Sequence, residues 1–271
     1  VGKLVPHLKS TAQILYVIYF GMTVVQVILL LLGGMSLFEA ITTSFSVAGT
    51  GGFGIVNDSM GSYSTYCQVV TTIFMILFGV NFSAYYLLLT KKFVQAFKFE
   101  EVRYYFGIIL AAILVIGLNT AHLFRNLGEA FQQAAFQVGS IITTTGFSST
   151  DFSQWPSLSK TILVLLMFVG ACAGSTGGGI KVSRILILCK AAKKEFQLYL
   201  HPKKIKMDEK TIGHDIIRST NIYLSVYLLI LAASVLIISL DNFDLITNFT
   251  AVTATLNNIG PGLEIVGPMG N

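Results

Sequence analysis

Five long apolar stretches, separated by polar segments, set the hydropathy pattern of the chain. They cover residues 11–32, 63–90, 104–124, 158–190 and 220–240. A helix needs about 20 apolar residues to cross the hydrocarbon core of a bilayer, and each stretch is long enough. The pattern therefore predicts an all-α, polytopic membrane protein.

The charges are distributed unevenly along this pattern. Only 11% of the 271 residues are charged, and all but two of the 18 Lys and Arg residues lie in segments 3–9, 91–103 and 181–218. If the five stretches alternate in direction, these three segments share one side of the membrane. The positive-inside rule makes that side cytoplasmic, with the N-terminus inside and the C-terminus outside. The net charge of +5 thus reflects membrane orientation, and we expect no nucleic-acid partner.

Three segments between the apolar stretches resemble one another. Aligning "ITTSFSVAGTGGFG" (41–54) with "AAFQVGSIITTTGFSS" (134–149) and "AVTATLNNIGPGL" (251–263) superposes Gly52, Gly146 and Gly260. Each copy follows a predicted span, begins with a short amphipathic run and ends in a turn rich in Thr, Asn and Gly. The repeated unit is a span, a half-helix, a turn and a second span.

Each half-helix has a recognisable start, a capping residue followed three positions later by an acid. These pairs are Ser36 with Glu39, Asn126 with Glu129, and Asp241 with Asp244. The distance from cap to aligned glycine is at most about 25–30 Å if the segment is helical throughout. We therefore expect each half-helix to enter the membrane, stop inside it and turn back.

The turns would leave main-chain polar groups inside the membrane, where an unsatisfied group costs several kcal/mol. A partly dehydrated cation could satisfy their carbonyl oxygens. Glycine tolerates positive φ, so successive carbonyls can point toward one axis. Carbonyls arranged in this way replace the hydration shell of an ion in selectivity filters.

With these loops in register, the chain resembles the Trk/Ktr/HKT superfamily of potassium transporters over essentially its whole length. The resemblance implies four fused helix, re-entrant pore helix, filter loop and helix units around a pseudo-fourfold pore. It assigns residues 1–98 to the second repeat, 99–200 to the third, whose second helix is broken, and 201–271 to a cytoplasmic linker and part of the fourth. The first repeat and the last membrane helix would belong to a longer transporter.

The resemblance also implies which residues select the ion. The filter residues are Thr50, Gly51, Gly52, Phe53, Thr144, Thr145, Gly146, Phe147, Asn258, Ile259, Gly260 and Pro261. Potassium would be coordinated by the backbone carbonyls of Gly51, Gly52, Thr145, Gly146, Ile259 and Gly260. Glycine at all three aligned positions favours potassium, since sodium-preferring relatives carry serine at one filter position, in the first repeat.

A second glycine-rich run, "GACAGSTGGGIK" (170–181), interrupts the fourth apolar stretch. Each glycine costs up to about 1 kcal/mol relative to alanine in a helix, so the stretch should break there. The resemblance implies a gating loop formed by Gly174, Ser175, Thr176, Gly177, Gly178, Gly179 and Lys181. The alternative is a continuous helix in which Gly170, Gly174 and Gly178 form a packing face.

The expected function is potassium uptake across the bacterial cytoplasmic membrane, without covalent chemistry and without an organic cofactor. Transport of sodium or another monovalent cation, or a structural membrane subunit without its own pore, are the alternatives. A membrane enzyme is disfavoured, because His7, His122, His201 and His214 are scattered. The resemblance further implies a homodimer in the lipid bilayer and a cytosolic ring of nucleotide-binding regulatory subunits of the TrkA or KtrA type.

Overall fold

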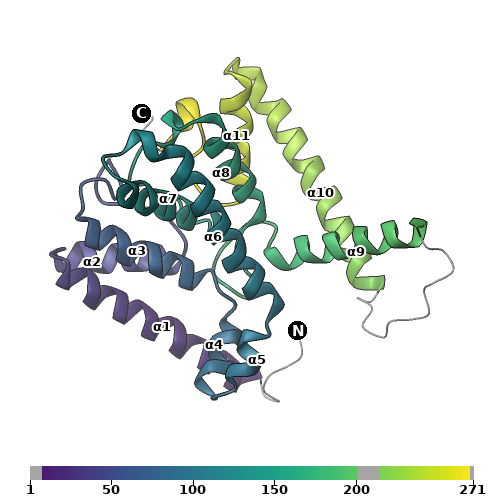
Figure 1. The fold of residues 1–271 in the computed structure, drawn as a ribbon, viewed down its shortest axis with the longest axis horizontal. Helices are drawn as coiled ribbons and strands as arrows, with labels where there is room; N and C mark the ends of the chain where they lie inside the picture. Colours follow the sequence, from purple (N-terminus) through teal and green to yellow (C-terminus); the bar gives the residue numbers. More distant parts are fainter. Residues whose placement is uncertain (1–7, 201–213, 269–271) are drawn as a thin grey trace.

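The computed structural model describes residues 8–200 and 214–268, and the regular structure in these residues is entirely helical (Figure 1). The predicted all-α fold is confirmed. Residues 201–213 of the predicted cytoplasmic linker lie outside the described residues. The α-helices are α1 (Leu8–Leu32), α2 (Leu37–Ala48), α3 (Thr65–Phe78), α4 (Phe82–Leu89), α5 (Phe93–Phe97), α6 (Glu100–Thr120), α7 (Leu127–Ile142), α8 (Ser157–Val169), α9 (Val182–Leu200), α10 (His214–Ile238) and α11 (Leu245–Leu256). Four 3₁₀ turns accompany them: η1 (Ala121–Leu123), η2 (Phe152–Gln154), η3 (Ser239–Asp241) and η4 (Glu264–Val266).

Three stretches in the described part of the chain are long and apolar enough to cross a membrane as single helices. They are Ala12–Leu32, Glu100–Leu123 and Asp215–Asp241. They match the first, third and fifth predicted spans. The other two predicted spans are interrupted.

The second predicted span, residues 63–90, is not one helix. Helices α3 and α4 meet at an angle of 92°, and the break lies between Phe78 and Phe82. The break can form because residue 79 is a glycine. The Tyr105 hydroxyl and the Thr143 methyl group occupy the space that a side chain at this position would need. The Asn81 side chain then caps α4 by accepting the Ser83 N–H at 2.9 Å.

Tyrosine hydroxyls donate to main-chain carbonyls at the end of α3, where the regular helical hydrogen bonding stops. Tyr105 donates to the Ile76 oxygen at 3.0 Å, and Tyr85 donates to the Leu77 oxygen at 2.6 Å. A bend at membrane depth is tolerated only where protein supplies such partners. The bend is therefore part of the packed structure.

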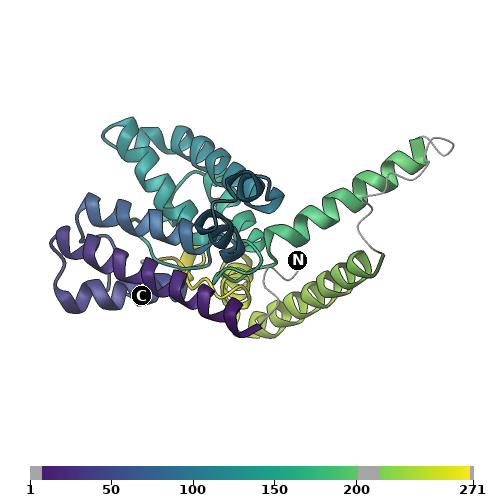
Figure 2. The same ribbon diagram turned by 90° about the horizontal axis from the view of Figure 1, so that it is seen from below.

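The helices form three groups that follow the sequence repeat. Helix α2 packs between α1 and α3, α7 packs between α6 and α8, and α11 packs against α10. Contacts of α3 with α7 and of α8 with α11 join each group to the next. Helices α9 and α10 project together from the rest, as two views show (Figures 1 and 2).

The half-helices begin close to the predicted residues. Ser36 and Glu39 form the complete capping box of α2, and Asn126 accepts the Glu129 N–H at the start of α7. The prediction of Asp241 as the third cap is wrong. Asp241 ends η3, after which Asn242 adopts a left-handed conformation, so α11 begins later.

Asp244 is the residue that caps α11. Its carboxylate accepts the Thr247 N–H at 2.9 Å and the Thr247 hydroxyl at 2.5 Å. These hydrogen bonds hold the pKa of Asp244 below its usual value. The cap is therefore charged at neutral pH, which suits the positive end of the helix dipole.

We predict that Gly117→Ala destabilises the contact between α6 and α7. A Cβ at Gly117 would lie 2.6 Å from the Phe131 ring, whereas a Cβ at Gly107 of the same helix would meet nothing within 4 Å. Overpacking costs about 1–3 kcal/mol, so the melting temperature in detergent should fall by several degrees. Gly107→Ala is the matched control and should leave it unchanged or higher. Equal melting temperatures would contradict this packing.

Candidate functional site: three converging turns and a glycine-rich loop

Helices α2, α7 and α11 end in the same turn. After the helix and one capping residue, Thr50, Thr144 and Asn258 adopt left-handed conformations with φ of 50°, 59° and 59°. The next amide donates back to the helix over distances of 2.7–2.9 Å, in the pairs Gly51 to Ser46, Thr145 to Ser140 and Ile259 to Ala254. This is the Schellman pattern of helix termination, built three times.

The aligned glycines follow each turn in conformations that disfavour any other residue. Their φ angles are 68° for Gly52, 88° for Gly146 and 110° for Gly260. A side chain at positive φ is strained. The glycines that the sequence repeat superposes thus occupy equivalent backbone positions.

The three turns converge on one cavity. A Cβ on Gly52 would collide with the Thr145 main-chain oxygen, and a Cβ on Gly146 with that of Ile259. Gly260 faces open space. All three glycines line a cavity of about 540 Å³, which the turns share with segments 53–59 and 265–268.

The main-chain oxygens of the three turns accept no hydrogen bond from the described part of the protein, and Gly51, Gly52, Gly146, Ile259 and Gly260 among these residues line the cavity. Within residues 8–200 and 214–268, no hydrogen bond reaches the carbonyl oxygens of residues 50–52, 144–146 or 258–260. Thr145 and Ile259 are nevertheless buried. Buried carbonyls without partners are uncommon and call for a ligand or water.

The other predicted filter residues take two different positions. Phe53 and Pro261 line the cavity with the glycines, and Phe53 is 83% exposed. Phe147 instead is 1% exposed and packs into the core beside α3. The alignment superposes Phe53 and Phe147, but their side chains have different environments.

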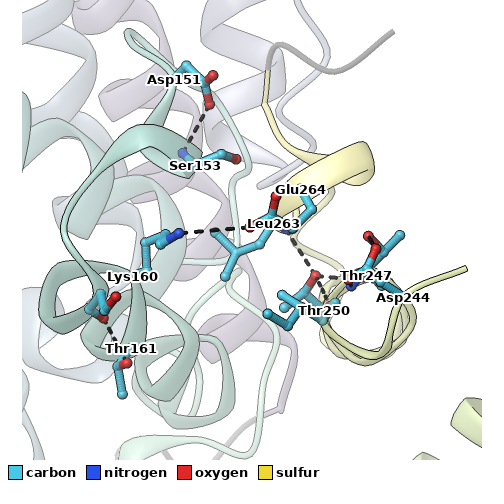
Figure 3. A network of polar contacts seen from close by, with 11 residues as sticks. Asp151, Ser153, Lys160, Thr161, Asp244, Thr247, Thr250, Leu263 and Glu264 are labelled. Carbon is cyan, nitrogen blue, oxygen red and sulfur yellow. Dashed lines mark hydrogen bonds and ion pairs between the residues drawn. The ribbon is translucent and has the colours of Figure 1, made fainter.

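The segment after the third turn is fixed against α8 and α11 (Figure 3). Leu263 donates its N–H to the Thr250 hydroxyl at 3.0 Å, and Glu264 forms an ion pair with Lys160 at 3.8 Å. Gly262 donates to the Val266 oxygen at 2.7 Å. These contacts hold Gly260 near the other two glycines.

The fourth predicted span breaks in the glycine-rich run, as predicted. Helix α8 ends at Val169 and α9 begins at Val182, so a continuous helix with a glycine packing face is wrong. Hydrogen bonds from Ile180 to Phe168 and from Lys181 to Val169 close the base of the excursion. We call residues 170–181 the glycine loop.

The glycine loop lies against the ends of all three half-helices. The Thr50 hydroxyl donates to the Thr176 oxygen at 3.2 Å, and the Gly178 N–H donates to the Thr144 hydroxyl at 2.5 Å. A Cβ on Gly178 would lie 2.5 Å from the Asn257 oxygen, and one on Gly177 would lie 2.8 Å from the Thr143 oxygen. Only residues without a side chain fit here.

The same loop is bonded to the break between α3 and α4. Cys172 donates its N–H to the Gly79 oxygen at 3.0 Å, and Phe82 donates to the Gly174 oxygen at 3.1 Å. The two interrupted spans thus satisfy each other's main-chain groups. Lys181, the last residue of the predicted gating loop, donates to the Gly177 oxygen within its own loop.

Two features of the site were missed in the sequence. Gly79 and Asn81, a glycine and a capping residue inside an apolar run, are the signal that marked the first break. Glu101 accepts hydrogen bonds from Ala173 of the glycine loop and from Ser183, two residues after the loop. An acid at the start of a membrane span is the signal that could have drawn attention to it.

Comparison with known proteins identifies the family. Residues 1–265 match the family TrkH, described as a cation transport protein. The chain belongs to the TrkH family. It is 33% identical to the Trk system potassium uptake protein TrkH of Vibrio parahaemolyticus over 96% of its length, and 34% identical to that of Salmonella typhimurium over 98%. It spans 56% of each of these relatives.

A solved structure of a TrkH-family protein has the same fold. The crystal structure of the potassium transporter TrkH from Vibrio parahaemolyticus superposes with a TM-score of 0.89 at 34% sequence identity. The match covers 98% of this chain and 59% of that one. The chain is therefore a multi-pass membrane protein of a bacterial transporter family and not an enzyme.

We predict that Thr144→Val loosens the glycine loop. Valine keeps the β-branched shape but cannot accept the Gly178 N–H, and a buried unsatisfied donor costs about 1–3 kcal/mol. Hydrogen exchange across residues 170–181 should therefore accelerate by about five-fold or more. Thr144→Ser keeps the hydroxyl and is the control. Equal exchange in the Val and Ser variants would contradict this contact.

Proposed function

We propose that the chain forms part of a potassium uptake pore whose selectivity filter includes the three converging turns. Potassium would be coordinated by the carbonyls of Gly51, Gly52, Thr145, Gly146, Ile259 and Gly260. The observation that carries the proposal is the set of carbonyl oxygens at one cavity, buried in part and free of donors. A dehydrated alkali ion offsets the cost of leaving them unpaired.

The electrostatics of the site favour a monovalent cation. The C-terminal, negative ends of α2, α7 and α11 meet the cavity, each equivalent to roughly half an elementary charge before screening. Within the described residues, no group of three or more His, Cys, Asp or Glu is placed to hold a metal ion. Magnesium and calcium sites normally require carboxylates. Neutral carbonyls with helix dipoles suit potassium better.

The relatives point to the same ion. The aligned Vibrio and Salmonella proteins are potassium uptake proteins by name. The chain spans about half their length, and Gly260 faces open space beside the cavity. We propose that the repeats 1–98, 99–200 and 201–271 surround the pore together with a further filter loop.

We propose that the glycine loop is the gate of this pore. It contacts the ends of all three pore helices, where a displacement changes access to the filter. Gly174, Ser175 and Thr176 also line a second cavity of about 410 Å³, together with residues of α1. A segment that borders both the filter helices and a separate cavity is well placed to obstruct an ion path.

The proposed setting is the bacterial cytoplasmic membrane, with the basic segments inside. Exposed Lys190 and Lys193 on the projecting α9 would face anionic lipid and a regulatory ring of the TrkA or KtrA type. A homodimer of the full-length protein completes the proposed assembly.

We predict that the full-length protein restores rubidium uptake to cells that lack potassium transport, and takes up sodium at least about ten-fold more slowly. Gly146→Ala should abolish rubidium uptake, because its Cβ would collide with the Ile259 oxygen. Gly107→Ala, on the outside of α6, is the control and should retain uptake. Preference for sodium would overturn the ion assignment. Absence of any uptake would favour a structural subunit.

We predict that shortening residues 174–179 raises rubidium flux through the purified full-length protein in liposomes. Removing the residues that contact Thr50 and Thr144 should leave the path open. Flux should rise while the preference for rubidium over sodium stays. An unchanged flux would place the gate elsewhere.

A further inference from the structure

Glu101 connects the glycine loop to a helix that is distant in sequence. It lies in the first turn of α6, and its Oε1 accepts the Ala173 N–H at 2.6 Å and the Ser183 N–H at 3.2 Å. Hydrogen bonds to an ionised acceptor are about twice as strong as neutral ones. A single carboxylate oxygen therefore joins three segments.

One donor lies in the first part of the glycine loop, and the other lies just after the loop. Ala173 belongs to the limb that leaves α8, whereas Ser183 lies in the first turn of α9. The first amides of a helix have no partners within it, and a carboxylate there is stabilised by the helix dipole. Glu101 thus caps α9 from another helix while it holds the loop.

The preceding residue, Glu100, contacts the same helix further along. It pairs with Lys190 at 2.5 Å, and both side chains are nearly half exposed. Such an exposed pair contributes little stability. The two neighbouring acids place α9 on the start of α6, and the partly buried Glu101 carries most of the attachment.

We propose that Glu101 is the positioning residue that keeps the glycine loop against the pore helices. The oxygen that accepts the Ala173 N–H also caps α9, and α9 follows the loop directly in the chain, so a displacement of α9 from α6 removes one of the two bonds and pulls the loop from the other. The projecting α9 then acts as the lever that releases the gate (Figures 1 and 2). This inference rests on the proposed function, in which the loop is the gate.

Glu101 carries a negative charge and the loop carries Lys181, so charge balance is a second role that the test must separate from hydrogen bonding. A glutamine at position 101 keeps an oxygen that can accept both amides but removes the charge. An alanine removes both. The two variants therefore separate hydrogen bonding from simple charge balance.

The test measures rubidium and sodium flux through the purified full-length protein in liposomes. Glu101→Ala should raise rubidium flux about five-fold, the effect of losing about 1 kcal/mol of attachment. Glu101→Gln should stay within about two-fold of the unmodified protein. The rubidium-to-sodium ratio should not change in either variant. Glu195→Gln, an exposed acid on α9, is the matched control.

Equal rubidium flux in the Ala variant and the unmodified protein would overturn the inference, as would a Gln variant indistinguishable from the Ala variant. Hydrogen exchange measured on each variant checks that it is folded. Exchange in residues 170–183 should accelerate in the Ala variant alone. The proposed function is tested separately by the unmodified protein: if it carries no rubidium, the proposed function fails before the variants are compared.

Discussion

Direct contact between main-chain atoms of neighbouring turns is the constraint on which this structure depends. Gly52 touches the Thr145 oxygen and Gly146 touches the Ile259 oxygen, at separations that exclude a Cβ. The contact requires three half-helices to end beside one another, with a left-handed residue after the cap of each one. The closely packed turns line one cavity with Gly52, Gly146 and Gly260, and in the described residues no protein donor reaches their carbonyl oxygens. The close packing of the turns and the proposed cation site therefore depend on the same glycines.

The two interrupted spans supply the protein surface that the ends of the half-helices need. Half-helices that stop inside a membrane need protein against their ends, since lipid cannot satisfy main-chain groups. The glycine loop supplies this surface, and the break between α3 and α4 supplies partners for the loop. Gly177 and Gly178 allow the approach to Thr143 and Asn257. The loop is held by separate hydrogen bonds and not by a continuous helix, so it can move without unwinding one.

Sequence periodicity and glycine spacing predicted the spans 11–32 and 104–124, the aligned glycines and the break at 170–181. Residues close together in the sequence determine each of these features. Several glycines in a row prevent a helix from continuing, and a capping residue allows a helix to begin. The break at Gly79 was missed because one glycine in an apolar run is common in membrane helices. Asp241 fits the pattern of a cap followed by an acid because Asp244 lies three positions later, and only the chain direction after Asn242 makes Asp244 itself the cap. The attachment of Glu101 to Ala173 joins residues far apart in sequence, so no local pattern could reveal it.

Anomalous X-ray scattering from rubidium in crystals of the full-length protein shows whether the carbonyls of the three turns hold an alkali ion. We expect a rubidium peak within coordinating distance of the main-chain oxygens of Gly51, Thr145 and Ile259, and potassium in the crystal should displace it. A filter cavity without a peak, or rubidium bound only to carboxylates elsewhere, would show that these carbonyls do not form the ion site.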